Sequence, residues 1–344
     1  MSRIKLSIIA LIFLNLAPGQ DVTKTGTTAS KFLSIGAGSR PVGMGGAFVA
    51  TADDASAMHW NVGGLAQLRR IELLVNYSEW LADIRFTYTG VAVPVGSSGT
   101  FGLDLTAMTM DEMEVTDYGY EDGTGETFQA GSYAVGMAYS QQLTDRFSIG
   151  IKGKYIGEFI SQSSATGVAL DIGTLFITPF KGIRFGASIS NFGQKMQMTG
   201  DDLLVPSDIA PNQEGNNESV TARLSTDRFD LPLLLRVGLA KDFSFGSGMD
   251  LTLALDAMHP NDNVEYINTG IELNLINGLA SLRGGLKSVY LDADTRKNET
   301  EELFTLGAGL HTRLAGNIQF KTDYAFESFA RLNNIHKFTI RLIF

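Results

Sequence analysis

The chain ends in the stretch KFTIRLIF, residues 337–344, and this stretch decides the fold. Apolar and polar side chains alternate in it through position 342. The apolar members are Phe338, Ile340, Leu342 and Phe344, and the polar ones are Lys337, Thr339 and Arg341. Because successive side chains of a β-strand point to opposite faces, this period of two predicts a strand with one apolar and one polar face.

The same alternation recurs from residue 70 to the end and marks fourteen segments of about ten residues or more. Strands of soluble proteins average about 5–6 residues, whereas a tilted strand needs about 9–11 to cross a bilayer. The sequence therefore predicts an all-β fold, a 14-stranded antiparallel transmembrane β-barrel over residues 70–344. The predicted strands cover residues 70–80, 84–95, 99–110, 128–141, 146–160, 165–178, 183–192, 230–241, 249–258, 264–275, 279–290, 302–313, 316–327 and 335–344.

The connections between these strands give a second, independent indication of a barrel. Links after even-numbered strands are short, such as GSS at residues 96–98 and ING at 276–278. Links after odd-numbered strands are often long: residues 111–127, more than thirty residues from Gly193, and residues 291–302. Short turns at one end and long loops at the other are typical of outer-membrane barrels, with the turns in the periplasm and the loops outside.

A soluble β-sandwich is the alternative, because its strands also alternate when one face packs a core. Strand length and the sorting of the loops favour the barrel. The chain also ends in an aromatic residue on an alternating strand, and Ile340, Leu342 and Phe344 resemble the C-terminal signal of outer-membrane barrels.

The N-terminus predicts export. Residues 1–19 combine a basic start (Arg3, Lys5) with an apolar run, LSIIALIFLNLA, and end in small residues, so we expect a signal peptide cleaved before Gln20. The alternative is a membrane anchor, but this run is too short to span a bilayer. The expected location is the outer membrane of a Gram-negative bacterium.

Composition excludes several classes of function. A formal net charge of −10 makes a nucleic-acid partner a poor fit, and the absence of cysteine excludes disulfides and thiolate metal sites. No two of the four histidines lie close in sequence, and neither a His-Glu-x-x-His nor a Gly-x-Ser-x-Gly motif occurs. We expect no enzyme, no catalytic residues, no metal and no cofactor, although a site assembled from distant strands stays open. Residues 111–128 carry seven acids and no base, which indicates a solvated loop or, alternatively, a loop that shares divalent cations with anionic lipid.

Residues 20–69 do not alternate, and they precede a barrel too wide for side chains alone to fill. They are predicted to form an N-terminal luminal hatch, or plug. One short helix is expected after a cap at Thr28 or Ser30 and before Gly36 and Gly38. A second is expected between Asp53 or Asp54 and the pair Gly63 and Gly64.

Glycines in GAGSRPVGMGG, residues 36–46, suggest a phosphate loop, but no Lys-Ser/Thr follows them. Tight turning in a confined lumen is the better interpretation. His59 beside Trp60 is expected to be a packed residue of the plug. Charged residues of the polar strand faces are expected to point into the lumen: Lys152, Lys154, Arg283, Lys287, Lys321 and Arg341.

The stretch GSRPVGMGGAFVATADDASAMHWNVGGLA, residues 38–66, together with residues 110–128 and 133–158, resembles the PorV/PorQ family of FadL-like outer-membrane barrels. The resemblance implies fourteen strands around an N-terminal hatch, and it covers essentially the whole mature chain. The residues that carry the hatch motif are Gly43, Gly45, Gly46, Asp53, Asp54, Trp60, Asn61 and Gly64. The family's Asn-Pro-Ala-Gly-like turn reads Asn61-Val62-Gly63-Gly64 here, and the missing proline predicts a looser turn.

The resemblance implies a role as an accessory component of type IX protein secretion or surface attachment, with the translocon or its cargo proteins as partners. The alternative is a FadL-like transporter that passes hydrophobic small molecules across the outer membrane. In both cases the barrel wall contacts outer-membrane lipid, and no nucleic acid is involved.

Overall fold

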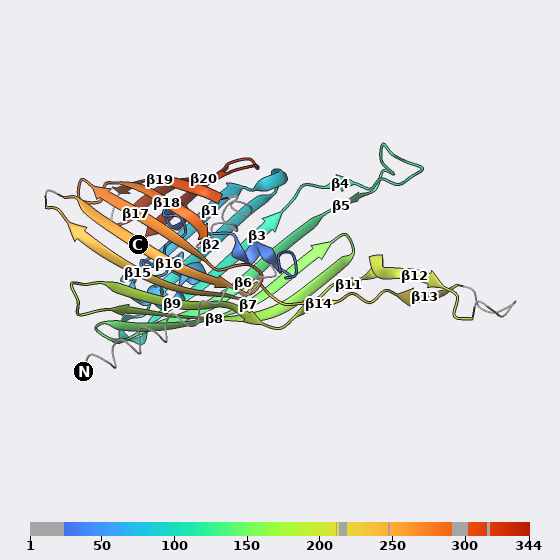
Figure 1. Cartoon of the computed structure of the whole chain (residues 1–344), viewed down its shortest axis with the longest axis horizontal. Coiled ribbons are helices and arrows are strands. Elements are labelled where there is room, and N and C mark those ends of the chain that lie inside the picture. Colours follow the sequence, from blue (N-terminus) through green and yellow to red (C-terminus); the bar gives the residue numbers. More distant parts are fainter. Residues whose placement is uncertain (1–23, 211, 213–218, 247, 291–301, 315–316) are drawn as a thin grey trace, which may run out of the picture.

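The computed structural model describes residues 24–344 except 211, 213–218, 247, 291–301 and 315–316. Fourteen long strands form one closed antiparallel barrel around a short N-terminal segment (Figure 1). The predicted signal peptide and almost all of the predicted loop at 291–302 lie outside the described residues.

The barrel strands follow one another in chain order around the ring, and the last pairs with the first, Val75 opposite Ile340. The fold class predicted from sequence is therefore confirmed, with strand ends shifted by up to four residues. The strands are β1 (Glu72–Glu79), β2 (Arg85–Pro94), β3 (Thr100–Thr109), β6 (Ala130–Thr144), β7 (Phe147–Ile160), β8 (Ser163–Ile177), β9 (Arg184–Gly193), β15 (Leu234–Ser244), β16 (Asp250–Pro260), β17 (Tyr266–Leu275), β18 (Ala280–Tyr290), β19 (Glu302–Arg313), β20 (Gln319–Phe329) and β21 (Ile335–Ile343).

The two faces of each strand differ as the alternation predicts. On β7, Ile151 is 46% exposed on the outside, whereas its neighbour Lys152 is 4% exposed on the inside. Leu103 and Leu306 face outward in the same way. An apolar outer face and a polar inner face suit a wall that contacts hydrocarbon on the outside only.

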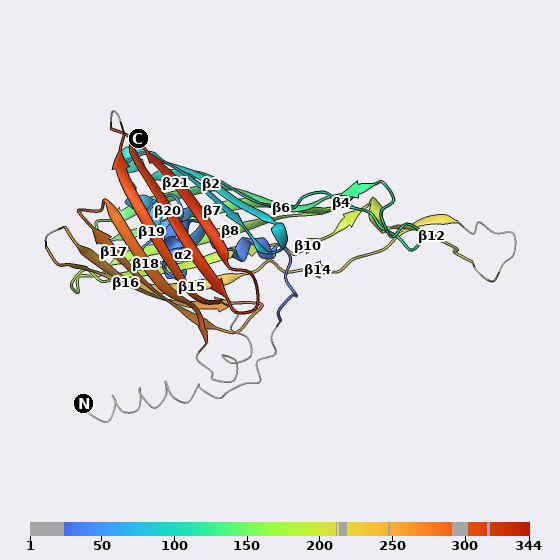
Figure 2. The ribbon, with the colours of Figure 1, turned by 90° about the horizontal axis from the view of Figure 1, so that it is seen from above.

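The two ends of the barrel are unlike. The end that carries the turns at 96–98, 145–146 and 276–279 is called the short-turn end below, and the opposite one the long-loop end. Two arms project together from the long-loop end (Figures 1 and 2).

The acidic arm, residues 110–129, contains β4 (Met113–Glu114) and β5 (Thr127–Phe128), which pair with each other. The long arm, residues 194–233, is also built from paired short strands. Its elements are β10 (Met196–Gln197), β11 (Thr199–Gly200), η5 (Asp201–Leu203), β12 (Leu204–Ser207), β13 (Val220–Arg223) and β14 (Arg228–Phe229). β11 pairs with the first two residues of β8, β10 with β14, and β12 with β13.

The N-terminal segment lies inside the barrel as four short helices: η1 (Lys31–Ser34), α2 (Ser39–Gly43), α3 (Ala57–Trp60) and η2 (Val62–Gln67). α2 packs on β18 to β21, while η2 packs on β3, β6, β7 and β8. Residues 24–69 are called the plug below. Two further turns of helix, η3 (Leu81–Asp83) and η4 (Gly96–Ser98), belong to connections of the barrel.

The plug corrects several details predicted from sequence. Ser30 precedes η1 but has a left-handed backbone (φ 53°) and makes no capping hydrogen bond, so the predicted cap is wrong. α2 is a helix that the sequence did not predict, because Pro41 and the glycines in and around it obscure it. Gly63 and Gly64 lie within η2 and do not end a helix; Asn61 separates α3 from η2.

Among the described residues, no helix is both long and apolar enough to cross a bilayer.

Candidate functional site

Many hydrogen bonds join the plug to the barrel wall. A short irregular segment has many backbone groups without partners, and in a closed lumen the wall must supply them. Asp256 of β16 accepts hydrogen bonds from the backbone nitrogens of Phe48 and Val49, at 2.7 and 2.8 Å. Thr305 of β19 accepts one from the Gly45 nitrogen at 2.9 Å. The polar inner faces of the strands therefore hold the plug by its backbone.

Glycines on the wall make room for that backbone. A Cβ on Gly285 of β18 would lie 2.2 Å from the Gly45 nitrogen, and one on Gly150 of β7 would lie 2.5 Å from the Val62 oxygen. A Cβ on Gly186 of β9 would lie 2.4 Å from the Val49 oxygen. Real Cβ atoms do not approach other atoms so closely, so the plug and wall fit only because these inward positions are glycine.

The hatch-motif glycines face the same interface. Gly45 (φ 67°) and Gly46 (φ 74°) adopt left-handed backbone that other residues rarely take, which turns the plug back from the wall. A Cβ on Gly43 would lie 3.1 Å from the Gly307 Cα on β19. The glycine run predicted to turn in a confined lumen is placed there by the structure, against β18 and β19.

The turn at Asn61 is tightly packed. The Asn61 side chain donates to the carbonyl oxygens of Val49 and Thr174, at 2.7 and 2.9 Å, and accepts from the Gly63 nitrogen at 3.1 Å. A Cβ on Gly63 would lie 2.7 Å from the Gly173 oxygen of β8, and one on Gly64 would lie 2.1 Å from the Ala52 oxygen. The turn is packed closely against the wall without the proline, and the looser turn expected from its loss stays a prediction.

Trp60 is the aromatic centre of the plug. It is 5% exposed and donates from Nε1 to the Ala37 oxygen at 2.8 Å. The Arg236 guanidinium of β15 lies 5.6 Å from its ring, within the range of a cation–π contact. His59 packs edge-on between Trp60 and Tyr88. Burial and the nearby Arg236 lower the pKa of His59 well below its usual value, so His59 is neutral.

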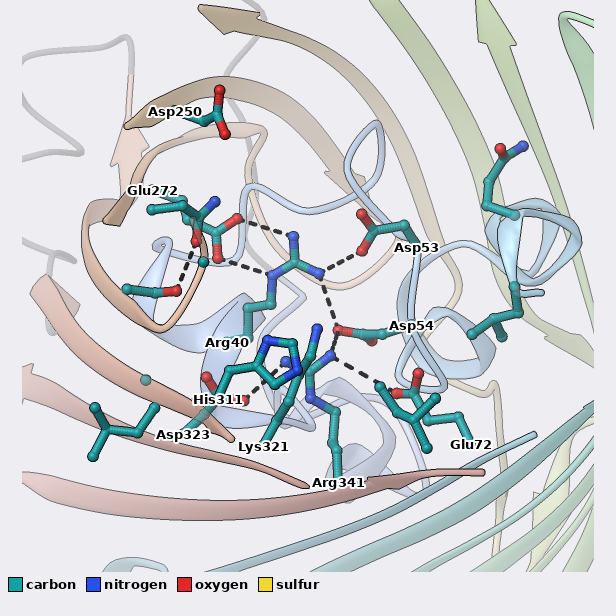
Figure 3. A pocket seen from close by; sticks show the side chains of 18 of the residues that line it. Arg40, Asp53, Asp54, Glu72, Asp250, Glu272, His311, Lys321, Asp323 and Arg341 are labelled. Atoms are coloured by element: carbon teal, nitrogen blue, oxygen red, sulfur yellow. Dashed lines mark hydrogen bonds and ion pairs between the residues drawn. The ribbon is translucent and has the colours of Figure 1, made fainter. Parts of the chain in front are cut away.

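A chain of buried ion pairs closes the short-turn half of the lumen (Figure 3). Arg40 of α2 binds both carboxylate oxygens of Glu272 on β17, at 2.9 Å each, and also pairs with Asp53 and Asp54. Arg341 of β21 binds Asp54 at 2.8 Å. Ion pairs thus join the plug to β17 and β21 of the wall.

The wall completes this charge network. Asp323 of β20 accepts from Arg283 at 2.7 Å and from Arg341 at 3.0 Å, and Arg283 also binds Glu272 at 2.7 Å. Burial acts to raise the pKa of Asp54, but Arg341 and Arg40 outweigh it and hold that pKa below its usual range. The pKa of Arg40 lies well above its usual value because its three carboxylate partners outweigh burial. Asp54 and Arg40 therefore stay ionised.

A polar cavity of about 440 Å³ lies beside this charge network at the short-turn end, with Lys321 and His311 in its lining (Figure 3). Within the described part of the chain, no group of three or more His, Cys, Asp or Glu side chains is arranged to hold a metal ion. The cavity is a small, charged recess whose acids are bonded to basic side chains or hydroxyls.

Asp53 and Asp54 join the charge network, the glycines line the wall, and Trp60, Asn61 and Gly64 hold the plug's turns together. Ile340 and Phe344 are each 48% exposed on the outer face, with Leu342 half-buried beside them. The predicted luminal basic residues point inward and form ion pairs, except Lys321, for which no ion pair is observed.

Sequence reasoning missed Arg40 of the plug and three acids of the wall, Asp256, Glu272 and Asp323. The three acids occupy inward positions of the alternating pattern. The alternation along each strand could therefore have identified them as luminal residues. Their partners could not be found in this way, because Asp256 and Glu272 bind the plug, and Asp323 binds Arg283 and Arg341 on other strands.

Apolar side chains are displayed on both arms. In the acidic arm, Tyr118 is fully exposed, Tyr120 is 64% exposed and Met113 is 46% exposed. In the long arm, Ile209 is 69% exposed and Leu224 is 55% exposed. Because the arms stand beyond the barrel, these side chains do not belong to the apolar belt of the wall.

A closed 14-stranded barrel of the outer-membrane type, plugged from its own N-terminus, is the class that this fold and site define. The family described as "Type IX secretion system protein PorV" matches residues 18–210. The chain belongs to this PorV family.

Solved structures with the same fold include a FadL homologue of Pseudomonas aeruginosa, at 13% identity, a TM-score of 0.53, and coverage of 89% of this chain and 97% of that one. The Ralstonia pickettii toluene transporter TbuX is 12% identical, with a TM-score of 0.54 and coverage of 90% and 97%. The CymD monoaromatic hydrocarbon channel is 11% identical, with a TM-score of 0.55 and coverage of 90% and 96%. These similarities concern the fold. No curated protein matches the chain in sequence.

Proposed function

We propose that this protein is a non-enzymatic accessory component of type IX secretion in the outer membrane of a Gram-negative bacterium. The two arms engage a protein of the translocon or its cargo, and the plugged barrel anchors them in the membrane. The observation that carries the proposal is the display of apolar side chains on arms that project from the long-loop end. Membership of the PorV family supports the assignment to type IX secretion.

The arms have the composition of a protein-binding surface. Tyrosine and methionine are enriched at protein interfaces, and loops held on a rigid scaffold commonly carry binding residues. The seven acids of residues 111–128 surround Tyr118 and Tyr120, so a partner with a basic rim would be steered toward them.

The contents of the lumen favour this role over passage of a hydrophobic solute. Lys152 pairs with Asp104, Lys154 with Asp171, and Arg283 with Glu272 and Asp323, all on the inner face. An apolar solute that crossed the lumen would have to displace the plug and pass these buried charges, which is costly without compensating partners.

A FadL-like transporter of hydrophobic small molecules is the second candidate, and one observation favours it. A cavity of about 240 Å³ lies at the long-loop end between β3, β6 and β7, and apolar side chains such as Met108, Phe159 and Met198 form much of its lining. A small apolar molecule would fit a site of this kind.

Substitution of the arms separates the two roles. We expect Tyr118→Ala with Tyr120→Ala to reduce both co-purification of secretion proteins and export of cargo. A variant at the short turn, Ser97→Ala with Ser98→Ala, is the matched control and should leave both unchanged. Normal cargo export by the arm variant and by a deletion strain, together with loss of hydrophobic-solute uptake in the deletion strain, would favour the second candidate.

A further inference from the structure

The first described residues of the plug lie at the long-loop end of the barrel. Thr28 forms a parallel bridge with Asp230 at the base of the long arm, and the Ala29 nitrogen donates to the Asp230 oxygen at 2.9 Å. The Thr28 hydroxyl donates to Asp262, in the connection after β16, at 2.7 Å, and Lys31 pairs with the same carboxylate at 2.5 Å. Both acids belong to connections at the long-loop end.

The last residues of the plug lie at the opposite end. Arg70, which follows the plug, donates from Nε to the Phe344 oxygen at 2.9 Å, and Arg69 donates to Gln142 next to a short turn at 3.3 Å. The plug therefore crosses the whole lumen, from the long-loop end at Thr28 to the short-turn end at Arg69.

The base of the long arm is built on the amino-terminal part of the plug. Phe32 and Leu33, 2% and 6% exposed, form one apolar cluster with Met196 of β10 and Leu231. The Ser30 hydroxyl lies 3.2 Å from the Met196 sulfur. β10 pairs with β14, so this cluster lies where both strands of the arm leave the barrel.

Residues 24–27, which precede this cluster in the sequence, are exposed. We propose that residues 24–28, the amino-terminal end of the plug, form part of the outer face of the protein beside the long arm, and that a protein docked on the arms covers them. The exposure follows from the path of the plug. The covering rests on the function proposed above, in which the arms bind a secretion protein.

Cysteine labelling tests the exposure directly, because the natural chain has no cysteine. Thr27→Cys is labelled on intact cells with a membrane-impermeant maleimide. Tyr118→Cys, on the acidic arm, is the outward control, and Ser97→Cys, in an exposed short turn, is the periplasmic control. Each variant is first checked for the barrel's anomalous migration on a gel before boiling.

We expect Thr27→Cys and Tyr118→Cys to react on intact cells, and Ser97→Cys to react only after the outer membrane is permeabilised. Reaction of Tyr118→Cys but not of Thr27→Cys on intact cells would overturn the proposed exposure. Reaction of Ser97→Cys instead of both would show the reverse orientation and contradict both the exposure and the proposed function.

The covering is tested by labelling Thr27→Cys in membranes that contain the secretion machinery and in detergent-purified protein. We expect the labelling rates of Thr27→Cys and Tyr118→Cys to fall several-fold in the membranes. Protection of Tyr118→Cys alone would contradict the covering while leaving the docking role intact. If neither Thr27→Cys nor Tyr118→Cys is protected, no protein docks on the arms, and residues 24–28 are not covered. The labelling of intact cells decides separately whether residues 24–28 lie on the outer face.

Discussion

Gly285 of the barrel and Gly45 of the plug lie so close that a Cβ on Gly285 would meet the Gly45 nitrogen at 2.2 Å. Neither residue can accept a side chain without moving backbone, because main-chain atoms of the facing segment lie too close to both. Close backbone packing therefore holds the plug in place, in addition to the ion pairs.

Gly285→Ala should displace the plug from β18. Overpacking in a filled interior costs about 1–3 kcal/mol, so we expect a lower thermal unfolding temperature in detergent and more frequent channel openings in a planar bilayer. Gly284→Ala is the matched control. Gly284 precedes Gly285 and faces outward, and its Cβ would lie 3.6 Å from the nearest atom, an ordinary contact. Equal behaviour of the two variants would contradict the close fit.

Arg40→Met should release the charged half of the plug. The substitution leaves Glu272 and Asp54 with fewer cationic partners in a buried site, and breaking a buried pair in this way costs about 3–5 kcal/mol. The measurement is protease cleavage within the plug, which should become faster. Arg85→Met removes an exposed pair with Asp111 and should have almost no effect, because exposed pairs contribute about 0–1 kcal/mol.

The sequence predicted the barrel well because the signal is local. Alternation depends only on neighbouring positions, and residues such as Ile151 and Lys152 show their opposite faces without knowledge of the partner strand. The plug was predicted as a segment with two short helices, but neither α2 nor its contacts with the wall were predicted. Its helices are one or two turns long, and contacts with the wall hold them, such as Asp256 to Phe48, across more than two hundred residues of sequence.

Individual site residues could likewise be predicted where their role depends on local backbone, and not where it depends on a distant partner. The glycines Gly45 and Gly46 could be assigned to tight turning, because positive φ is a local property. The pairing of Arg40 with Glu272 could not be predicted, since it depends on which strand of the closed ring faces α2. Likewise, the close approach of the wall to position 63 could not be predicted, and only the distance from Gly63 to Gly173 of β8 shows why glycine is needed there.

Acid should destabilise the plug. His59 stays neutral in the fold, because burial and Arg236 lower its pKa, so below about pH 6.5 the unfolded chain binds a proton that the fold does not. Asp54 acts in the same direction nearer pH 4, because its pKa is lowered in the fold. Stability is therefore lost as pH falls through each unfolded-state pKa.

Thermal unfolding at pH 7.5 and pH 5.5 (about one unit on either side of the histidine pKa) measures the His59 contribution. We expect the natural protein to lose more unfolding temperature, or to gain less, than His59→Gln when the pH is lowered. His259→Gln, at an exposed histidine, should respond to pH as the natural protein does. An unchanged pH dependence in His59→Gln would contradict the assignment to the buried imidazole.

The arms should matter for binding and not for stability. Ile209→Ser with Leu224→Ser removes two exposed apolar side chains of the long arm, so we expect the unfolding temperature to stay the same and capture of secretion proteins to fall. A large drop in stability would show that these side chains pack within the protein and are not displayed for a partner.

Site-specific photo-crosslinking on living cells tests the central claim most directly. A photoreactive amino acid replaces Tyr118, which is fully exposed on the acidic arm, or Met137, which is 67% exposed on the outer face of β6. We expect crosslinks from position 118 to a translocon or cargo protein, with no such crosslink from position 137 in the apolar belt. Absence of any protein crosslink at position 118, in cells that secrete cargo normally, would contradict the central claim.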